Sequence, residues 1–139
     1  MKNILLTGCA GFIGFHTCNR LLEENYNIIG IDNLNEYYDV TLKESRLNIL
    51  KNNKNFVFKK LDFSDYDNLL ELEDYKFDIV LHLGAQAGVR YSLTNPHTYT
   101  KYNIDGTLNL LEFARKKGID HFIFASSSSV YGNNKKFPF

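Results

Sequence analysis

Short apolar runs alternate with longer amphipathic segments along this chain. The runs are dense in Ile, Val, Leu and Phe and lack strict polar alternation, which predicts buried strands. We expect them at residues 3–7, 27–32, 56–60, 78–83 and 121–125. Helical spacing predicts helices at residues 12–24 and 40–52, a short one capped by Ser64-Asp65, and a long one from Asn95-Pro96 to about Lys117.

Strands of this composition that alternate with helices favour an α/β fold with helices on both faces of a parallel sheet. Connections between parallel strands are almost always right-handed, so the sheet should be doubly wound. The most common arrangement then predicts the strand order 3-2-1-4-5. The length of 139 residues fits one domain, 1–139.

Composition and charge narrow the class of protein. Sixteen basic and sixteen acidic side chains balance, which gives no electrostatic reason to expect a nucleic-acid partner or an anionic membrane. No apolar run approaches the roughly 20 residues of a membrane span. The two cysteines, Cys9 and Cys18, form no disulfide framework, which favours a reducing compartment. We therefore expect a cytoplasmic protein.

A glycine-rich stretch, "TGCAGFIG", lies between the first strand and the first helix, with glycines at Gly8, Gly11 and Gly14. In such a turn the first glycine allows the sharp bend, the second lets the backbone approach a pyrophosphate, and the third lets the helix pack on the sheet. The helix N-terminus adds free N–H groups and a positive dipole. A plain tight turn is the alternative.

Asp32 ends the second strand, where a carboxylate can bind the hydroxyls of an adenosine ribose. A simple turn cap is the alternative interpretation. None of the following residues 33–36 is cationic, and Asp32 would repel a 2′-phosphate. The sequence therefore predicts NAD as the cofactor in preference to NADP.

Several stretches together carry a family resemblance: "TGCAGFIG", "DNLNEYYDVTLK", Asp62, "HLGAQAGVRYSLTNP", "YNIDGTLNLLE" and "SSSSVYG". They resemble the extended short-chain dehydrogenase/reductases with their Rossmann-type domain, and more narrowly the UDP-glucuronate 4-epimerases of polysaccharide biosynthesis. The resemblance implies an isomerase that uses bound NAD to oxidise C4 of a nucleotide sugar to a 4-keto intermediate and then reduces it again. UDP-glucuronate is the suspected substrate.

The resemblance also implies which residues contact the cofactor. These are Gly8, Gly11, Phe12, Ile13, Gly14, Asp32, Asn33, Asn35, Asp62, Phe63, Leu83, Gly84, Ala85, Gln86 and Asn103. Relatives usually carry alanine at the place of Gly84, and the missing methyl group should matter little. Tyr37 and Tyr38 either close over the cofactor or sugar or serve packing. The histidines lack ligand spacing, and we predict no metal.

Four serines follow the fifth strand. By the resemblance, Ser127 is the catalytic hydroxyl that binds the reacting sugar oxygen, and Ser129 is a second sugar contact. Arg90 either binds an anionic group of the substrate or is a solvated surface residue. Carboxyl groups that related 4,6-dehydratases and decarboxylases carry beside the catalytic hydroxyl are absent, which favours epimerisation.

The base of this superfamily is a tyrosine in a helical Tyr-x-x-x-Lys motif. Tyr131 and Lys135 have the spacing, but Gly132 and two asparagines between them favour a turn. We therefore expect this chain to be an N-terminal fragment, truncated before the catalytic motif and the substrate domain and inactive alone, from a homodimeric parent. The alternatives are a non-catalytic dinucleotide-binding module, or another epimerase or dehydratase of the superfamily.

Overall fold

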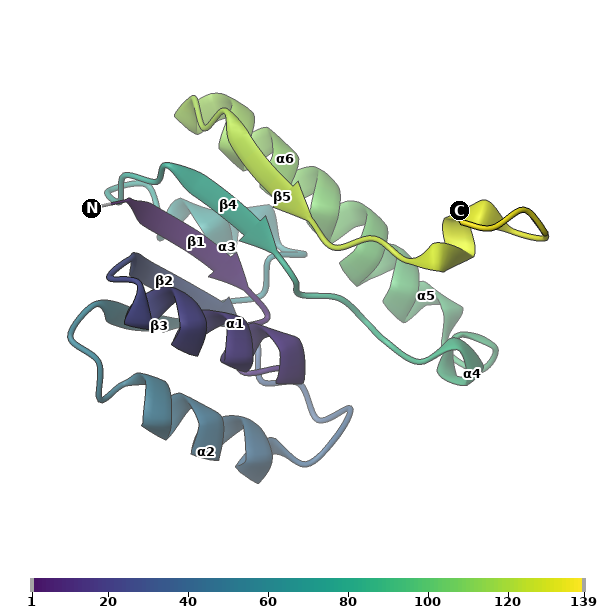
Figure 1. Ribbon diagram of the computed structural model, residues 1–139, viewed down its shortest axis with the longest axis horizontal. Coiled ribbons are helices and arrows are strands. Elements are labelled where there is room, and N and C mark those ends of the chain that lie inside the picture. The colour runs from purple at the N-terminus through teal and green to yellow at the C-terminus, as the bar shows by residue number, and fades with distance from the viewer. Residues whose placement is uncertain (1, 139) are drawn as a thin grey trace.

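The computed structural model describes residues 2–138 and contains one parallel sheet (Figure 1). Its strands are β1 (Asn3–Thr7), β2 (Asn27–Asp32), β3 (Phe56–Lys60), β4 (Ile79–His82) and β5 (His121–Phe124). All neighbouring pairs are parallel, and the order is β3-β2-β1-β4-β5. The predicted doubly wound topology is confirmed.

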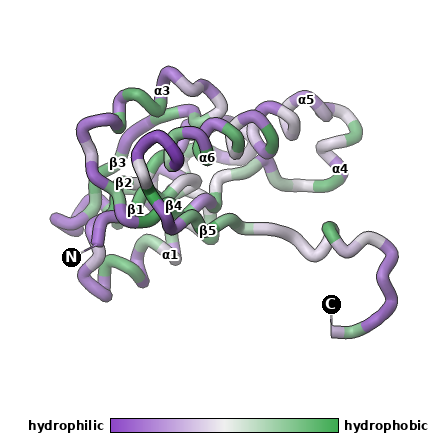
Figure 2. The backbone as a smooth tube through the Cα atoms, turned by 90° about the horizontal axis from the view of Figure 1, so that it is seen from above, coloured by the Kyte–Doolittle hydropathy of each residue, from purple (hydrophilic) through white to green (hydrophobic). Residues whose placement is uncertain are grey.

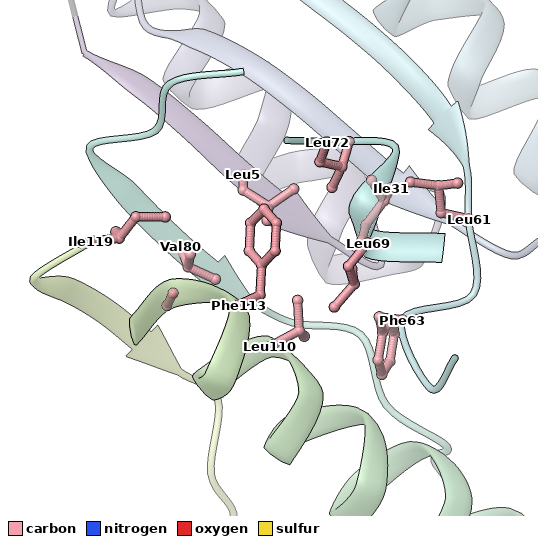
Figure 3. Packing of buried hydrophobic residues seen from close by; sticks show 11 residues of the cluster. Leu5, Ile31, Leu61, Phe63, Leu69, Leu72, Val80, Leu110, Phe113 and Ile119 are labelled. Carbon is pink, nitrogen blue, oxygen red and sulfur yellow. The ribbon is translucent and has the colours of Figure 1, made fainter. Parts of the chain in front are cut away.

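Helices cover both faces of the sheet, because successive side chains of a strand point to opposite sides. Ile4 and Leu6 of β1 pack with residues of α1 (Phe12–Glu23) and α2 (Val40–Leu50). Leu5 packs on the opposite face with residues of α3 (Tyr66–Leu70) and α6 (Gly106–Lys117). Figure 3 shows this second cluster, in which Phe113 of α6 points toward Leu5.

The long helix expected from Asn95-Pro96 to about Lys117 is present as one continuous helical segment, but its middle is a π-helix, which was not predicted. The segment consists of α5 (Pro96–Tyr99), a π-helix η1 (Thr100–Asp105) and α6. A π-helix adds a residue to a turn, and such turns are frequent at functional sites. Gly118 ends α6 in the left-handed conformation, with φ +67°, as its lack of a Cβ atom permits.

Two short helical turns were not predicted, α4 (Val89–Ser92) and the 3-10 turn η2 (Ser128–Tyr131). The residues from Phe124 to Lys136 are exposed, and Figures 1 and 2 both show the segment after β5 leading away from the sheet. The 3-10 turn ends at Tyr131 and Gly132 follows with φ +56°, so Tyr131 and Lys135 share no helical face. Within residues 2–138, no helix has the length and apolar character needed to cross a membrane.

Candidate functional site

A cavity of about 510 Å³ opens at the carboxyl ends of β1, β2 and β4. In parallel α/β sheets ligands bind at this edge, where connections diverge to opposite faces. Predicted cofactor residues in its wall are Gly8, Gly11, Phe12, Ile13, Gly14, Asp32, Asn33, Asn35, Phe63, Leu83, Gly84, Ala85 and Gln86. The structure thus brings together segments that lie up to 78 residues apart, from Gly8 to Gln86.

The glycine loop forms the floor of the cavity. Gly8 has φ +72°, and a methyl group there would lie 2.8 Å from the Cα atom of Gly84. A methyl group on Gly14 would overlap the carbonyl oxygen of Gly8. Gly11 precedes α1 and offers no side-chain cap to the first turn of that helix. Backbone N–H groups at the positive end of α1 therefore remain available to an anionic ligand.

Asp32 connects two loops at one end of the cavity. Its Oδ2 atom accepts a hydrogen bond of 3.2 Å from the backbone N–H of Ala10 in the glycine loop, and Oδ1 accepts one of 2.9 Å from Leu34. The side chain is buried, with 8% exposed. A carboxylate has about four lone-pair sites, so Asp32 keeps acceptor capacity for hydroxyl groups of a ligand.

Two cations of α2, Lys43 and Arg46, also line the cavity and were not predicted from the sequence. Lys43 is buried, and its Nζ atom donates to the backbone oxygen and Oδ1 of Asn35 at 2.8 and 2.9 Å. Burial lowers the pKa of Lys43, and the nearby Asp32 carboxylate opposes that effect. Arg46 donates from Nη1 to the carbonyl oxygen of Ala10 at 3.1 Å and to the Tyr38 hydroxyl at 3.3 Å. The two side chains hold the loops on either side of Asp32.

The spacing of buried positions could have located Lys43. It lies four residues before Leu47 and seven before Leu50, and all three are buried on one face of α2. A cation on the apolar face of a helix needs nearby polar partners, which here are atoms of Asn35. Leu42, Ala87 and Tyr102 complete the part of the cavity wall that was not predicted.

Phe63 is wedged between two glycines in the wall. A Cβ atom on Gly84 would lie 2.7 Å from Cε1 of the ring, and one on Gly106 would lie 2.6 Å from Cδ2. Phe63 is itself buried, and its ring lies edge-on against His82 with 5.2 Å between centroids. An alanine at position 84 would therefore collide with a confined ring unless that ring shifted, whereas the small effect expected of the missing methyl group on cofactor binding stays a prediction.

Aromatic side chains join the loop after β2 to the segment after β4. The Tyr37 and Tyr91 ring centroids lie 5.0 Å apart. The single hydroxyl hydrogen of Tyr99 is shared between the carbonyl oxygen of Ala87, at 2.9 Å, and that of Gly88. Gly88 has φ +93°, and a methyl group there would overlap the Tyr37 hydroxyl. Because β2 and β4 flank β1, this contact spans the strand that carries the glycine loop.

Five predicted site residues lie outside the cavity wall, and their roles remain predictions. Asp62 accepts from the N–H and hydroxyl of Ser64 and lies 3.6 Å from Lys101 Nζ. Asn103 is bonded through its side chain to both backbone groups of Gln86. Arg90 is exposed on α4.

Ser127 and Ser129 are exposed after β5, with their Oγ atoms 3.1 Å apart. The Oγ atom of Ser127 also accepts a hydrogen bond of 3.2 Å from the backbone N–H of Ser129. The two hydroxyls therefore form one local pair. Among residues 2–138, no group of three or more His, Cys, Asp or Glu side chains is placed to hold a metal ion.

The sequence matches a protein family and is similar to several known proteins. Residues 5–139 match the protein family described as GDP-mannose 4,6 dehydratase. The chain is 60% identical over 99% of its length to an uncharacterized protein of Methanocaldococcus jannaschii, and 48% identical over 94% to a UDP-glucuronate 4-epimerase of Thermodesulfobacterium geofontis. It covers 43% and 41% of those two proteins.

A solved structure shares the fold over nearly the whole chain. It is the UDP-glucuronic acid 4-epimerase of Bacillus cereus in complex with UDP-glucuronic acid and NAD, with a TM-score of 0.86 and 39% identity. The match covers 96% of this chain and 43% of that protein. The chain thus spans about two fifths of the length of the relatives that it matches.

Proposed function

We propose that this chain, which belongs to the GDP-mannose 4,6 dehydratase family, is the NAD-binding part of a UDP-glucuronate 4-epimerase. The observation that carries the proposal is the cavity built from the glycine loop, Asp32 and the segment after β4. Relatives of this sequence include a UDP-glucuronate 4-epimerase, and a neighbour of the same fold was solved with UDP-glucuronic acid and NAD.

The residues of the cavity fit a dinucleotide. Gly14 lacks the methyl group that would overlap the carbonyl oxygen of Gly8, so α1 can lie close to the turn and its N-terminus can face a pyrophosphate. The Asp32 carboxylate has acceptor sites left for the two hydroxyls of an adenosine ribose. The remaining wall from Leu83 to Gln86 would border the nicotinamide side.

The same residues favour NAD over NADP. A 2′-phosphate would stand beside the buried Asp32 carboxylate, and two like charges in contact repel. Lys43 and Arg46 are close, but Lys43 already donates to Asn35, and Arg46 donates to Ala10 and Tyr38. A 2′-phosphate would have to displace these hydrogen bonds in order to pair with Lys43 or Arg46. The two cations therefore do not favour NADP.

The chain's own residues supply positioning for the reaction. Bound NAD would accept and return a hydride, which makes the oxidation at C4 reversible. Ser127 would donate a hydrogen bond to the reacting sugar oxygen, Ser129 would hold a neighbouring group, and the Arg90 guanidinium would contact an anionic group of the substrate. A neutral hydroxyl is a poor base, so Ser127 would orient the oxygen and steady its proton.

Two finer proposals concern the whole protein. A homodimer is supported by the exposed apolar side chains Ile104, Leu108 and Leu111, which lie at helical spacing along η1 and α6. Sedimentation of the full-length protein tests this.

A cytoplasmic location is supported by the free, buried thiols of Cys9 and Cys18. Cell fractionation tests it.

The direct test of function uses the full-length protein with UDP-glucuronate. We expect UDP-galacturonate to form without added oxidant or reductant, since hydride leaves and returns within one cycle. The isolated chain should bind NAD but show no turnover. Release of a dehydrated 4-keto-6-deoxy product, or no reaction with any UDP-sugar, would contradict the assignment as an epimerase.

A further inference from the structure

A buried hydrogen-bond chain crosses the molecule behind the cavity. Thr7 ends β1 immediately before the glycine loop, and His82 ends β4; they are 0% and 2% exposed. The Thr7 hydroxyl lies 2.7 Å from Nδ1 of His82, and Nε2 of His82 lies 3.1 Å from the Thr107 hydroxyl on α6. Three elements are therefore joined through one imidazole.

The hydrogen-bond partners of Thr7 and Thr107 determine which atoms donate and which accept along this hydrogen-bond chain. The backbone N–H of Gly84 donates to the Thr7 oxygen at 2.9 Å, and the Thr107 hydroxyl donates to the carbonyl oxygen of Asn103 at 2.8 Å. Because the single hydroxyl hydrogen of Thr107 is donated to the carbonyl oxygen of Asn103, the Thr107 oxygen must accept a hydrogen bond from Nε2–H of His82. Nδ1 is then unprotonated and accepts from the Thr7 hydroxyl.

The opposite tautomer of His82, protonated at Nδ1, would satisfy the hydrogen-bonding groups of Thr7 and Thr107 less well. Nδ1–H would donate to Thr7, which already accepts from Gly84, and the Thr7 hydroxyl hydrogen would lose its nitrogen acceptor. Thr107 would have to turn its hydrogen from Asn103 to Nε2. Burial lowers the pKa of His82 to about 4, so the ring is neutral at neutral pH and one tautomer must be chosen.

Each end of the hydrogen-bond chain contacts a segment of the cavity wall. Thr7 is bonded to Gly8 and holds Gly84 through its N–H, and the two glycines approach so closely that a methyl group on Gly8 would meet Gly84. Asn103, at the other end, accepts at 2.7 Å from the N–H of Gln86 and donates to its carbonyl oxygen at 3.0 Å. The imidazole itself is not part of the cavity wall.

We propose that His82, as the Nε2-protonated tautomer, is a positioning residue that sets the relative placement of Gly8, Gly84 and Gln86 around the nicotinamide side of the cofactor. The proposal rests on the proposed NAD site. His82 contacts neither cofactor nor substrate and takes no part in proton transfer. It acts through Thr7 on one side and through Thr107 and Asn103 on the other.

The first measurement is the tautomer itself, which needs no cofactor. Nitrogen-15 NMR of the chain labelled at histidine, with the His82 signals assigned by their loss in His82→Gln, should show a protonated Nε2 and an unprotonated Nδ1. A protonated Nδ1 would overturn the proposal. This spectroscopic result depends on the hydrogen-bond direction and not on overall stability.

The second measurement is NAD affinity of the chain after substitution of Thr107, which is not in the cavity wall. Thr107→Val removes the acceptor while keeping the shape, and we expect NAD binding to weaken by about two- to tenfold, the effect of one lost hydrogen bond. Thr107→Ser keeps the hydroxyl and should bind NAD within about twofold of the unmodified chain. Circular dichroism at the titration temperature checks that each variant is folded.

The outcomes separate the positioning role from simple packing. Unchanged affinity in Thr107→Val would overturn the role of the hydrogen-bond chain. Equal weakening in Thr107→Ser would also overturn it, because the lost methyl group would then be responsible. If the unmodified chain binds no NAD, the proposed function fails and the positioning role fails with it, while the tautomer still reports whether the hydrogen-bond chain exists.

Discussion

The rings of Tyr37 and Tyr91 meet with 5.0 Å between their centroids and an interplanar angle of 56°. Tyr37 belongs to the loop after β2 and lines the cavity, whereas Tyr91 belongs to α4 after β4. Their contact joins two segments that flank the glycine loop. Because Tyr37 lines the cavity, its ring forms part of the wall beside which a ligand on that loop would lie, and the contact with Tyr91 holds that ring in place.

We therefore predict that Tyr37→Ala speeds dissociation of NADH, the reduced form of the cofactor, from the chain. An aromatic pair contributes roughly 0.5–1.5 kcal/mol beyond its buried area, so the rate should rise by about two- to tenfold. Stopped-flow displacement of bound NADH measures it. Tyr37→Phe keeps the ring and is the matched control, with a dissociation rate near that of the unmodified chain. Equal rates for all three proteins would contradict a closing role for this contact.

Gly84→Ala should destabilise the chain, because the new methyl group would lie 2.7 Å from the buried ring of Phe63. Overpacking of this kind costs about 1–3 kcal/mol in the free energy of unfolding, which urea denaturation measures. Phe63→Leu removes the obstructing ring, so the added cost of Gly84→Ala should largely vanish in the double variant. Additive effects in this double-mutant cycle would show that the two sites do not interact.

The strands were predictable because each is a short run rich in apolar residues, although only β1, β2 and β4 in the middle of the sheet are largely buried, whereas β5 at the edge is mostly exposed. Asp32 was predictable from its place at the end of β2. Lys43 was not predicted, although the helical spacing to Leu47 and Leu50 puts it on the buried face of α2. The cation contacts of Asn35 depend on how α2 docks, which local sequence does not specify.

The π-helix η1 escaped prediction for a different reason. Nothing in its sequence TKYNID distinguishes a π-turn from an α-turn, whereas the segment makes tertiary contacts: Asn103 bonds to Gln86, and Gly106 leaves room for Phe63. The partners of Asn103 and Gly106 lie 17 and 43 residues away in the chain. A pattern read over neighbouring residues cannot contain that information.

Stability should fall in acid because of His82. Its pKa is about 4 in the folded chain against an ordinary 6.5, since burial disfavours the charged ring. Between these values the unfolded chain binds a proton that the folded chain does not. The stability present above pH 6.5 is therefore lost progressively as pH falls toward 4, by up to about 3 kcal/mol.

Urea denaturation at pH 7, 6, 5 and 4 measures this loss, and His82→Gln provides the comparison. Glutamine has no ionisable group, so the difference in unfolding free energy between the two proteins should shrink as pH falls. Carboxyl groups common to both proteins cancel in that difference. A difference that stays constant across the range would contradict the assignment of the acid sensitivity to His82.

Ser127→Ala in the full-length protein should lower kcat far more than it lowers NAD affinity. Loss of one oriented donor that acts mainly in the transition state should reduce kcat by about 10–10³-fold. Steady-state kinetics with bound NAD quantified measures both. Ser126→Ala removes a hydroxyl from the same stretch and is the matched control, with nearly normal kcat. Ser129→Ala tests the second serine, and wild-type turnover of Ser127→Ala would reject Ser127 as the catalytic hydroxyl.

We predict that the Asp32 carboxylate adapts this cavity to the ribose of NAD. Calorimetric titration of the chain with NAD and with NADP tests it most directly, alongside Asp32→Asn, which keeps a side-chain oxygen but removes the charge. We predict that the unmodified chain binds NAD at least about tenfold more tightly than NADP, the effect of roughly 1.4 kcal/mol, and that Asp32→Asn narrows this ratio. Equal affinity of the unmodified chain for both dinucleotides, or no binding of either, would contradict the account.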